Sequence, residues 1–377
     1  MKFLFPIDGD CLNSRDGRKT ELGLTVPVRV SAPADHEILI GGVPASFADG
    51  VYTAEISLVG YRHTILAEDR TAGETERITV LTLPRAEGYY RLSSDDNIIF
   101  LQDITAHADE YTSIFDNPYL AIYKKAHDLY GAKAHLNLFY AFEPTARFSD
   151  TSRTCFDLSM MTDKFKEEFK ANSDWLKLAF HAHAEFPDRP YQHATAEKIT
   201  EDCTRVCREI IRFAGEECIS DSTTVHWGEA NRECVRALRA MGMRSLTGYF
   251  ERLPDGTPLV AYYTDGELLD HIGARDFWLD TAEDMLFGRI DLVLNDSTYE
   301  YIMSEIAKIA EDPFRSGFVS VMIHEQYFHK DYRRYLADFE ARVLDTCRFL
   351  SERGYVGAHI TETVEEPHFR FGARLGL

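Results

Sequence analysis

The stretch YYRLSSDDNIIF (residues 89–100) decides the fold of this chain, because a strand-like run ends there in two adjacent carboxylates. Asp95 and Asp96 carry like charges that repel, so a fold tolerates both only where water, hydrogen bonds or a cation absorb the charge. A solvated turn after the strand is one explanation, since Asp and Asn favour turns. A cation site at the end of the strand is the other. The sequence on either side distinguishes the two.

Upstream of this stretch, the sequence reads as short strands separated by turns. Strand-like segments with glycine-containing turns lie at 24–32, 36–58 and 63–83, and no helical periodicity interrupts them. Short strands at intervals of about 8–12 residues are typical of a β-sandwich. We therefore expect residues 1–86 to form a small all-β domain of immunoglobulin-like type.

Downstream of it, apolar strands alternate with amphipathic helices. Expected strands lie at 89–94, 132–140, 175–183, 223–227, 245–250, 289–295, 318–325 and 355–360. Expected helices include 196–215, 231–242 and 332–354. Repeated strand–helix units favour parallel strands joined by right-handed crossovers. The sequence thus predicts an α/β protein in which an irregular (β/α)7-8 barrel, residues 87–377, follows the small immunoglobulin-like sandwich domain.

The overall composition limits the class of function. With a net charge of −21 on 377 residues, the chain lacks the surplus of Lys and Arg that nucleic acid requires, and it is unsuited to an anionic membrane. Seven scattered cysteines form no zinc-binding box. We see neither a signal-peptide core nor an apolar run of about 18 residues, so we expect a cytoplasmic protein without a membrane partner. A homo-oligomer is left open.

Polar side chains gather at the ends of the expected strands, where a (β/α) barrel builds its active site. They are Asp95, Asp96, His135, Asn137, His181, His183, Glu185, His226, Trp227, Asp291, Asn295, His324 and Glu325. Hydrogen bonding inside a core would explain any one of the histidines. Several strand ends that carry imidazole or carboxylate and meet at one rim instead predict a site for a divalent metal.

Three of these groups resemble, in order and spacing, the motifs of polysaccharide deacetylases of the NodB-homology type, carbohydrate esterases with an irregular (β/α) barrel. The family's first motif, Thr-Phe-Asp-Asp-Gly, corresponds to Ser93–Asn97. The resemblance implies that Asp95 is the general base and Asp96 a metal ligand. The family's last motif, an apolar strand ending in Leu-x-His, corresponds to VSVMIHE (319–325) and implies that His324 is the general acid.

The family's second motif, His-Ser/Thr-x-x-His, falls on HAHAE (181–185), which has Glu where the second histidine stands. The resemblance implies that His181 binds the metal. It leaves the third ligand open among His183, Glu185 and His226. Zn²⁺ is the favoured metal, with Ni²⁺, Co²⁺ and Fe²⁺ as alternatives. The resemblance does not extend to the expected β-domain.

Together these residues predict a metal-dependent hydrolase that removes an acetyl or other acyl group from a carbohydrate. We expect His135, Asn137, Trp227 and Glu325 to contact this substrate, with the indole of Trp227 stacking on a sugar ring. Tyr249 is expected to pack in the core.

Departures from the motifs keep a non-catalytic function open. Ser94, Asn97 and Ala182 stand where the family has Phe, Gly and a hydroxyl residue, and the family's middle motifs have no clear counterpart. A carbohydrate-binding relic of the same fold would carry such changes.

Two other enzymatic functions compete with the deacetylase. A glycoside hydrolase needs two carboxylates flanking the sugar, and Asp96, Asp291 and Glu325 are candidates, although this leaves the histidines unexplained. The pair His181 and His183 also resembles the first motif of amidohydrolases. That fold carries the motif on its first barrel strand, whereas two expected strands precede it here.

Overall fold

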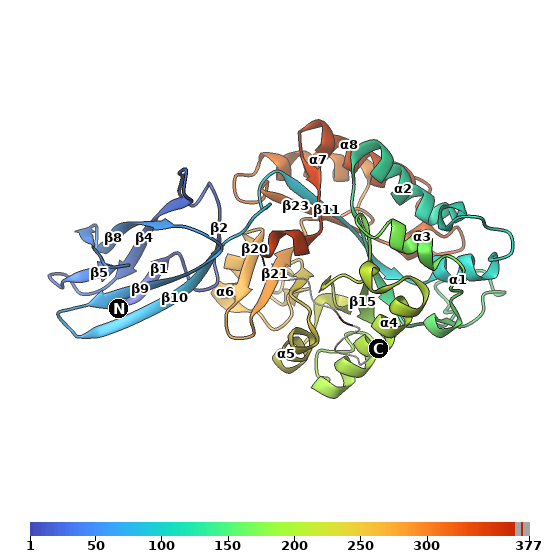
Figure 1. The fold of residues 1–377 in the computed structure, drawn as a ribbon, viewed down its shortest axis with the longest axis horizontal. Helices are drawn as coiled ribbons and strands as arrows, with labels where there is room; N and C mark the ends of the chain where they lie inside the picture. Colours follow the sequence, from blue (N-terminus) through green and yellow to red (C-terminus); the bar gives the residue numbers. More distant parts are fainter. Residues whose placement is uncertain (366–370, 372–377) are drawn as a thin grey trace.

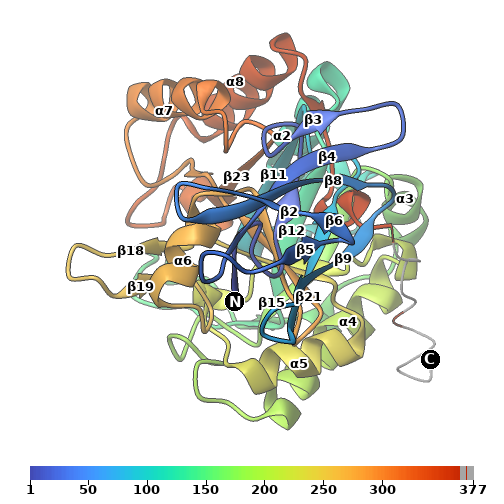
Figure 2. The same cartoon turned by 90° about the vertical axis from the view of Figure 1, so that its left-hand side faces the viewer.

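The computed structural model describes residues 1–365 and Phe371. Figure 1 shows a group of N-terminal strands beside a larger part in which helices surround a set of strands, and in Figure 2 the N-terminal strands face the viewer. Among the described residues, no helix combines the length and the apolar character needed to cross a membrane.

The N-terminal part is built from ten strands. They are β1 (Lys2–Phe5), β2 (Cys11–Leu12), β3 (Arg18–Lys19), β4 (Leu24–Ser31), β5 (Ile38–Ile40), β6 (Val43–Pro44), β7 (Ser46–Ala48), β8 (Val51–Leu58), β9 (Arg62–Asp69) and β10 (Glu74–Thr82). One sheet has the order β1-β4-β8-β7, with β3 beside β4. The other has the order β2-β10-β9-β5-β6.

A shared apolar core holds these two sheets together. Val26, Val28 and Val30 of β4 are fully buried in this core, and Ile65 and Ala67 of β9 join it from the other sheet. Inward apolar residues that alternate with more exposed ones are typical of sheets with one face toward water. Residues 2–82 thus form two packed sheets, as expected, while the immunoglobulin-like type remains a prediction.

The larger part contains two mainly parallel sheets. The first has the order β15-β12-β11-β23-β22, with β24 beside β11, and the second has the order β16-β17-β21-β20. The first sheet consists of β11 (Tyr89–Asn97), β12 (Ala134–Phe139), β15 (Leu176–Ala182), β22 (Leu292–Val293), β23 (Phe318–His324) and β24 (Val356–Gly357). The second consists of β16 (Ser222–Thr223), β17 (Ser245–Gly248), β20 (Phe277–Asp280) and β21 (Met285–Arg289). Two short antiparallel pairs are β13 (Ala141–Phe142) with β14 (Phe156–Asp157) and β18 (Glu251–Arg252) with β19 (Pro258–Leu259).

Helices flank these sheets. They are α1 (Ile99–Ala106), α2 (Pro118–Tyr130), α3 (Lys166–Ala171), α4 (Ala196–Phe213), α5 (Arg232–Met241), α6 (Gly266–Gly273), α7 (Tyr299–Glu311) and α8 (Phe339–Glu352). Their ends follow from the sequence. The Asn231 side chain accepts a hydrogen bond from the backbone of Cys234 at the start of α5, and Gly242 ends this helix with a φ of 113°.

The mixed α/β class is confirmed, but the strands of the described residues form no single closed sheet. Backbone hydrogen bonds connect the two sheets of the larger part at both sides. The amide of Ser220, just before β16, donates to the carbonyl of Leu178 in β15 at 2.9 Å, and the amide of Asp291, just after β21, donates to the carbonyl of Ser320 in β23 at 2.8 Å. The closed (β/α) barrel therefore remains a prediction.

Several elements differ from their predicted bounds. The expected strand 223–227 ends at Thr223, and the chain continues in a 3₁₀ turn, His226–Gly228. The expected helix 332–354 begins only at Phe339, because backbone hydrogen bonds close the preceding residues into turns. Helices α1, α2, α3, α6 and α7 were not among the helices located from the sequence, and β20 runs antiparallel to β21.

Candidate metal centre

The two adjacent aspartates occupy a β-bulge at the end of β11. Ser94 pairs with Leu136 of β12 and Asn97 pairs with Leu138, so β11 has one residue more than β12 over this interval. Asp96 has a φ of 60°, in the left-handed region that Asp enters more readily than most residues. A bulge of this kind redirects a side chain at the end of a strand. The bulge thus gives the two carboxylates different surroundings.

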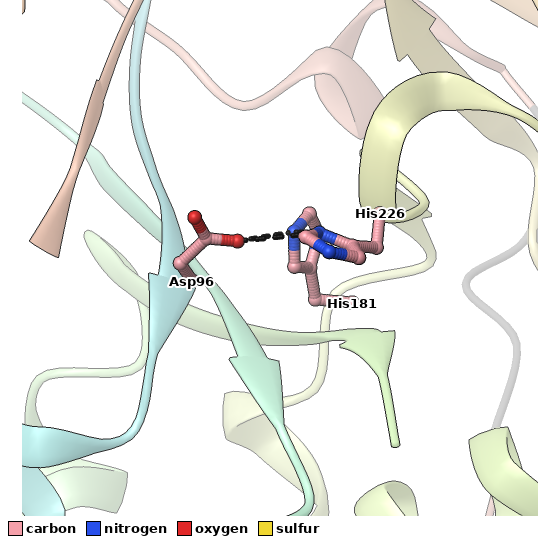
Figure 3. A group of neighbouring side chains, drawn as sticks. All are labelled: Asp96, His181 and His226. Atoms are coloured by element: carbon pink, nitrogen blue, oxygen red, sulfur yellow. Dashed lines mark hydrogen bonds and ion pairs between the residues drawn. The ribbon is translucent and has the colours of Figure 1, made fainter. Parts of the chain in front are cut away.

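Asp96 lies beside two histidines from other segments (Figure 3). Its Oδ1 is 3.0 Å from the Nε2 of His181 and 3.3 Å from the Nδ1 of His226, and these two ring nitrogens are 3.1 Å apart. His181 is on β15, and His226 begins the 3₁₀ turn that follows β16. All three side chains are buried, and within the described residues they form a group whose ligand atoms lie within 4.8 Å of one another.

Backbone carbonyls fix the orientation of both imidazole rings. The Nδ1 of His181 is 2.5 Å from the carbonyl oxygen of Thr224, and the Nε2 of His226 is 3.1 Å from that of Glu185. A carbonyl oxygen only accepts, so each of these nitrogens carries a proton and donates it. When the rings are neutral, the nitrogens that face Asp96 are the ones with a lone pair, and a second proton on either ring would lie between that ring and the carboxylate. Metal-binding histidines are commonly held in this way by a hydrogen bond from their second nitrogen.

The spacing of the three inward atoms fits a tetrahedral metal ion. Zn²⁺ binds imidazole nitrogen and carboxylate oxygen at about 2.0–2.2 Å, which puts neighbouring ligand atoms roughly 3.3–3.6 Å apart. The separations of 3.0, 3.1 and 3.3 Å are close to that range. Three protein ligands leave the fourth position to water or substrate, as in catalytic zinc sites. The donor set therefore fits a divalent metal.

The electrostatics of the group favour a cation. Burial raises the pKa of Asp96, but the hydrogen bonds with His181 and His226 outweigh it and hold this pKa well below its usual range. Burial lowers the pKa of His181, whereas the hydrogen bond with Asp96 raises it, and the net effect is a raised pKa. An ionised carboxylate thus sits beside an imidazole that tends to hold a second proton, and a bound dication takes the place of that proton.

The group opens into a cavity of about 450 Å³ that Asp95 and His324 also line. These two residues are register partners on the neighbouring strands β11 and β23. Asp95 Oδ1 accepts a hydrogen bond from the Asn137 amide at 2.6 Å. His324 donates from Nδ1 to the Oδ1 of Asn295 at 2.9 Å, which leaves its Nε2 available. A carboxylate and an imidazole thus share one cavity with the metal-binding group.

The two other candidates for the third metal ligand have different partners. Glu185 forms an ion pair with Arg147 and accepts a hydrogen bond from the amide of Gln326 at 2.8 Å. His183 is partly exposed and stacks on a tyrosine ring at 5.4 Å between centroids. Among the three candidates, the structure brings only His226 into the buried group.

Of the residues expected to contact substrate, Trp227 lines the cavity, whereas Asn137 and His135 do not. Trp227 lines the cavity with a side chain that is 40% exposed. Asn137 is buried and bonds to Asp95, and His135 is buried beneath it, with Nε2 3.1 Å from the Oδ1 of Asn137. Tyr249, expected in the core, instead lines the cavity.

Glu325 is a helix cap in this structure and does not line the cavity. Its carboxylate is fully buried and accepts hydrogen bonds from the backbone amides of Ile98, Ile99 and Phe100 at 2.6, 3.0 and 2.5 Å. These amides begin α1 and have no partner within the helix. The expectation that Glu325 binds substrate is therefore corrected, because its oxygens are already occupied by backbone donors.

Sequence reasoning missed several residues that shape the cavity. Asn295, one of the polar residues at the expected strand ends but not an expected site residue, accepts hydrogen bonds from both the backbone and the ring of His324. Arg147 and Gln326 hold Glu185 at the cavity wall. Both come from loop or turn sequence with no strand or helix pattern, so no periodic signal could have indicated them.

Comparisons with known proteins give matches to solved structures alone: no family model and no curated protein matches the sequence. A CE4 family pseudoenzyme from Bacillus anthracis is 11% identical, with 81% of this chain and 85% of that chain covered and a TM-score of 0.33. The peptidoglycan N-acetylglucosamine deacetylase Bc1960 is 10% identical, with 76% and 93% covered and a TM-score of 0.36. A candidate polysaccharide deacetylase involved in O-antigen biosynthesis, from Bordetella bronchiseptica, is 13% identical, with 77% and 89% covered and a TM-score of 0.34. At such identities and TM-scores, function has to be inferred from the side chains of this chain.

Proposed function

We propose that this protein is a metal-dependent hydrolase that removes an acetyl or other acyl group from a carbohydrate. One observation carries the proposal. The donor atoms of Asp96, His181 and His226 converge within 3.3 Å of one another in a cavity that also holds a second carboxylate and an imidazole. Metal-assisted hydrolysis of an acyl group uses this combination of groups.

In this proposal Asp96, His181 and His226 hold the metal, and Zn²⁺ suits their donor atoms best. The bound dication supplies Lewis acidity, which polarises an acyl carbonyl and lowers the pKa of water. The chain orients the two rings for metal binding. Backbone carbonyls accept a hydrogen bond from the outer nitrogen of each ring, so the inner nitrogens of His181 and His226 can bind the metal through their lone pairs.

Asp95 is the proposed general base. It lines the cavity next to Asp96 in the sequence, and its Oδ1 is occupied by the Asn137 amide at 2.6 Å. This hydrogen bond orients the carboxylate and leaves Oδ2 to accept a proton from the attacking water.

His324 is the proposed general acid. The hydrogen bond from its Nδ1 to Asn295 orients the ring and leaves Nε2 available to pass a proton to the leaving amine or alkoxide. Its register pairing with Asp95 puts the acid and the base on adjacent strands of one cavity wall.

The cavity supports a sugar as the substrate. Its volume of about 450 Å³ lies within the usual range for small-molecule sites, which is roughly 300–1,000 Å³. The aromatic side chains of Trp227, Tyr249 and Tyr327 line it together with polar groups. Trp227 remains the residue that we propose to stack on a sugar ring, because its indole is partly exposed at the cavity.

Metal content and acetate release test the proposal together. We expect about one equivalent of metal by plasma mass spectrometry in the wild type, and none in the Asp96→Asn or His181→Ala variants. The metal-loaded wild type should release acetate from at least one acetylated sugar. Wild-type protein that binds no metal after incubation with Zn²⁺ or Ni²⁺ would refute the mechanism. Metal and sugar binding without acetate release would instead identify a carbohydrate-binding relic.

A glycoside hydrolase finds less support. Of its three candidate carboxylates, Glu325 caps α1, and Asp291 is buried, with one oxygen 3.2 Å from Arg315 and the other accepting from the Ser320 amide. Neither of these two lines the cavity. Of these three candidates only Asp96 lines the cavity, and its carboxylate lies between His181 and His226, an arrangement that a pair of glycosidase carboxylates leaves unexplained.

We further propose that residues 1–86 and 87–377 are two domains, an immunoglobulin-like sandwich and an irregular (β/α) barrel. The separate apolar core of the N-terminal sheets supports the division. A smaller apolar cluster that includes Cys11, Leu81, Phe277 and Phe318 connects the two parts, which supports a structural role for the sandwich.

A further inference from the structure

We propose that the sugar substrate carries an anionic group, a carboxylate or a phosphate, which Arg333 and Arg334 bind at the cavity while the acyl group lies at the metal centre. This inference rests on the proposed function. The walls of the cavity carry an unusual concentration of positive charge. Three arginines, Arg147, Arg333 and Arg334, line the same cavity as the metal-binding group, although the chain as a whole carries a net charge of −21.

Arg333 and Arg334 are exposed and have no carboxylate partner among the described residues. The polar contact of the Arg334 guanidinium is the hydroxyl of Tyr327 at 3.2 Å. Arg147 differs, because its guanidinium is paired with Glu185. Two of the three guanidinium groups in the cavity are thus free to bind an anion.

The acidic residues nearest in the sequence do not neutralise this pair. Asp331 accepts two hydrogen bonds from Arg153, at 2.5 and 2.6 Å, and Asp338 accepts one from Arg342 at 2.9 Å. In a chain rich in carboxylates, two adjacent arginines therefore remain without an acidic partner at the proposed active site. Such unpaired guanidiniums favour carboxylate and phosphate ligands, which they bind through two parallel hydrogen bonds.

A bound metal makes the cavity attractive to anions. The carboxylates that line it are those of Asp95, Asp96, Glu185 and Asp296. The three guanidiniums and a bound dication would together outweigh these four carboxylates by one positive charge. A positively charged cleft on a strongly acidic protein concentrates anionic ligands over neutral ones.

Isothermal titration of the Zn²⁺-loaded full chain tests this inference. The probes are N-acetylglucosamine, its 1-phosphate, its 6-phosphate and N-acetylglucosaminuronic acid, which separate a phosphate from a carboxylate and one position from another. We expect at least one charged sugar to bind on the order of tenfold more tightly than the neutral sugar. The double variant Arg333→Gln/Arg334→Gln should lose most of this preference.

A matched variant controls for the loss of two positive charges. Arg205 and Arg208 are exposed on α4, outside the cavity, so Arg205→Gln/Arg208→Gln should keep the preference for the charged sugar. Equal affinities for all four sugars, or an unchanged preference in Arg333→Gln/Arg334→Gln, would overturn the inference. Acetate release from the neutral sugar under those conditions would leave the proposed function intact. Failure of every sugar to bind would overturn the inference, whereas metal content and acetate release still decide the proposed function. Preferential binding of a charged sugar without acetate release would support the inference and overturn catalysis alone.

Discussion

His181 Nε2 lies 3.1 Å from His226 Nδ1, although each ring donates its other N–H to a backbone carbonyl. Two neutral rings held in this way point lone pairs at each other and at the carboxylate of Asp96. Such a contact is unfavourable unless a proton or a cation lies between the atoms. A metal ion relieves all three repulsions at once, and this relationship is the basis of the predictions on metal binding.

Metal binding should stabilise the folded chain and depend on His226. Because the ligands converge only in the folded state, Zn²⁺ at a hundredfold excess over its Kd should add about 3 kcal/mol to the free energy of unfolding. We expect chelator to lower the Tm of the wild type and to leave that of His226→Ala unchanged, as measured by differential scanning calorimetry.

His183 provides the matched control for this experiment. It belongs to the same sequence motif as His181, but it is partly exposed and outside the buried group. His183→Ala should therefore keep the chelator-dependent change in Tm. If His183→Ala loses that change and His226→Ala keeps it, His183 is the ligand and the assignment of His226 is wrong.

Metal affinity should fall as the pH is lowered. In the metal-free protein the hydrogen bond with Asp96 raises the pKa of His181 above its usual value near 6.5. Below that raised pKa the ring is charged, and the metal must displace its proton, so the affinity should decrease by about tenfold per pH unit. Well above it the dependence on this group should vanish. Competition with a chromophoric chelator between pH 5.5 and 8.5 measures the slope. A constant affinity over this range would contradict the coupling between the two residues.

Asp95→Asn should separate metal binding from turnover. The amide is nearly the same size as the carboxylate, so the fold and the metal content should persist, while the loss of a general base should reduce kcat by about 10²–10⁴-fold. Steady-state acetate release and metal analysis on the same preparation check both parts. Loss of the metal in this variant would show that Asp95 is a ligand and would move the base elsewhere.

The sequence predicted the parts of the site that lie on regular strands. Asp96 and His181 lie near the ends of β11 and β15, two strands that are largely buried, and their positions could be read from apolar runs that end in polar residues. His226 was one of three equal candidates, because it sits in a 3₁₀ turn where Trp227 has a φ of 65°. The direction of its ring depends on the carbonyl of Glu185, 41 residues away, and no local pattern encodes such a contact.

The alternation of side chains along a strand could have indicated that Glu325 does not face the cavity. His324 ends β23, and successive side chains of a strand point to opposite faces, so a residue directly after it is expected to face away from the cavity. The shape of the larger part was harder to predict. Strands β16, β22 and β24 overlap expected strands but have only two residues each, and the sequence pattern does not indicate where the backbone pairing stops.

Glu325→Gln should destabilise the fold without removing the metal. The carboxylate is fully buried and accepts hydrogen bonds from three backbone amides at the start of α1, where the helix dipole also favours a negative charge. A neutral amide loses the charge and places an NH₂ group against backbone donors, which should cost about 3 kcal/mol. Urea unfolding measures the loss, with the exposed Glu352→Gln as the control that should stay near the wild type. Normal stability combined with weaker sugar binding would instead return Glu325 to the substrate site.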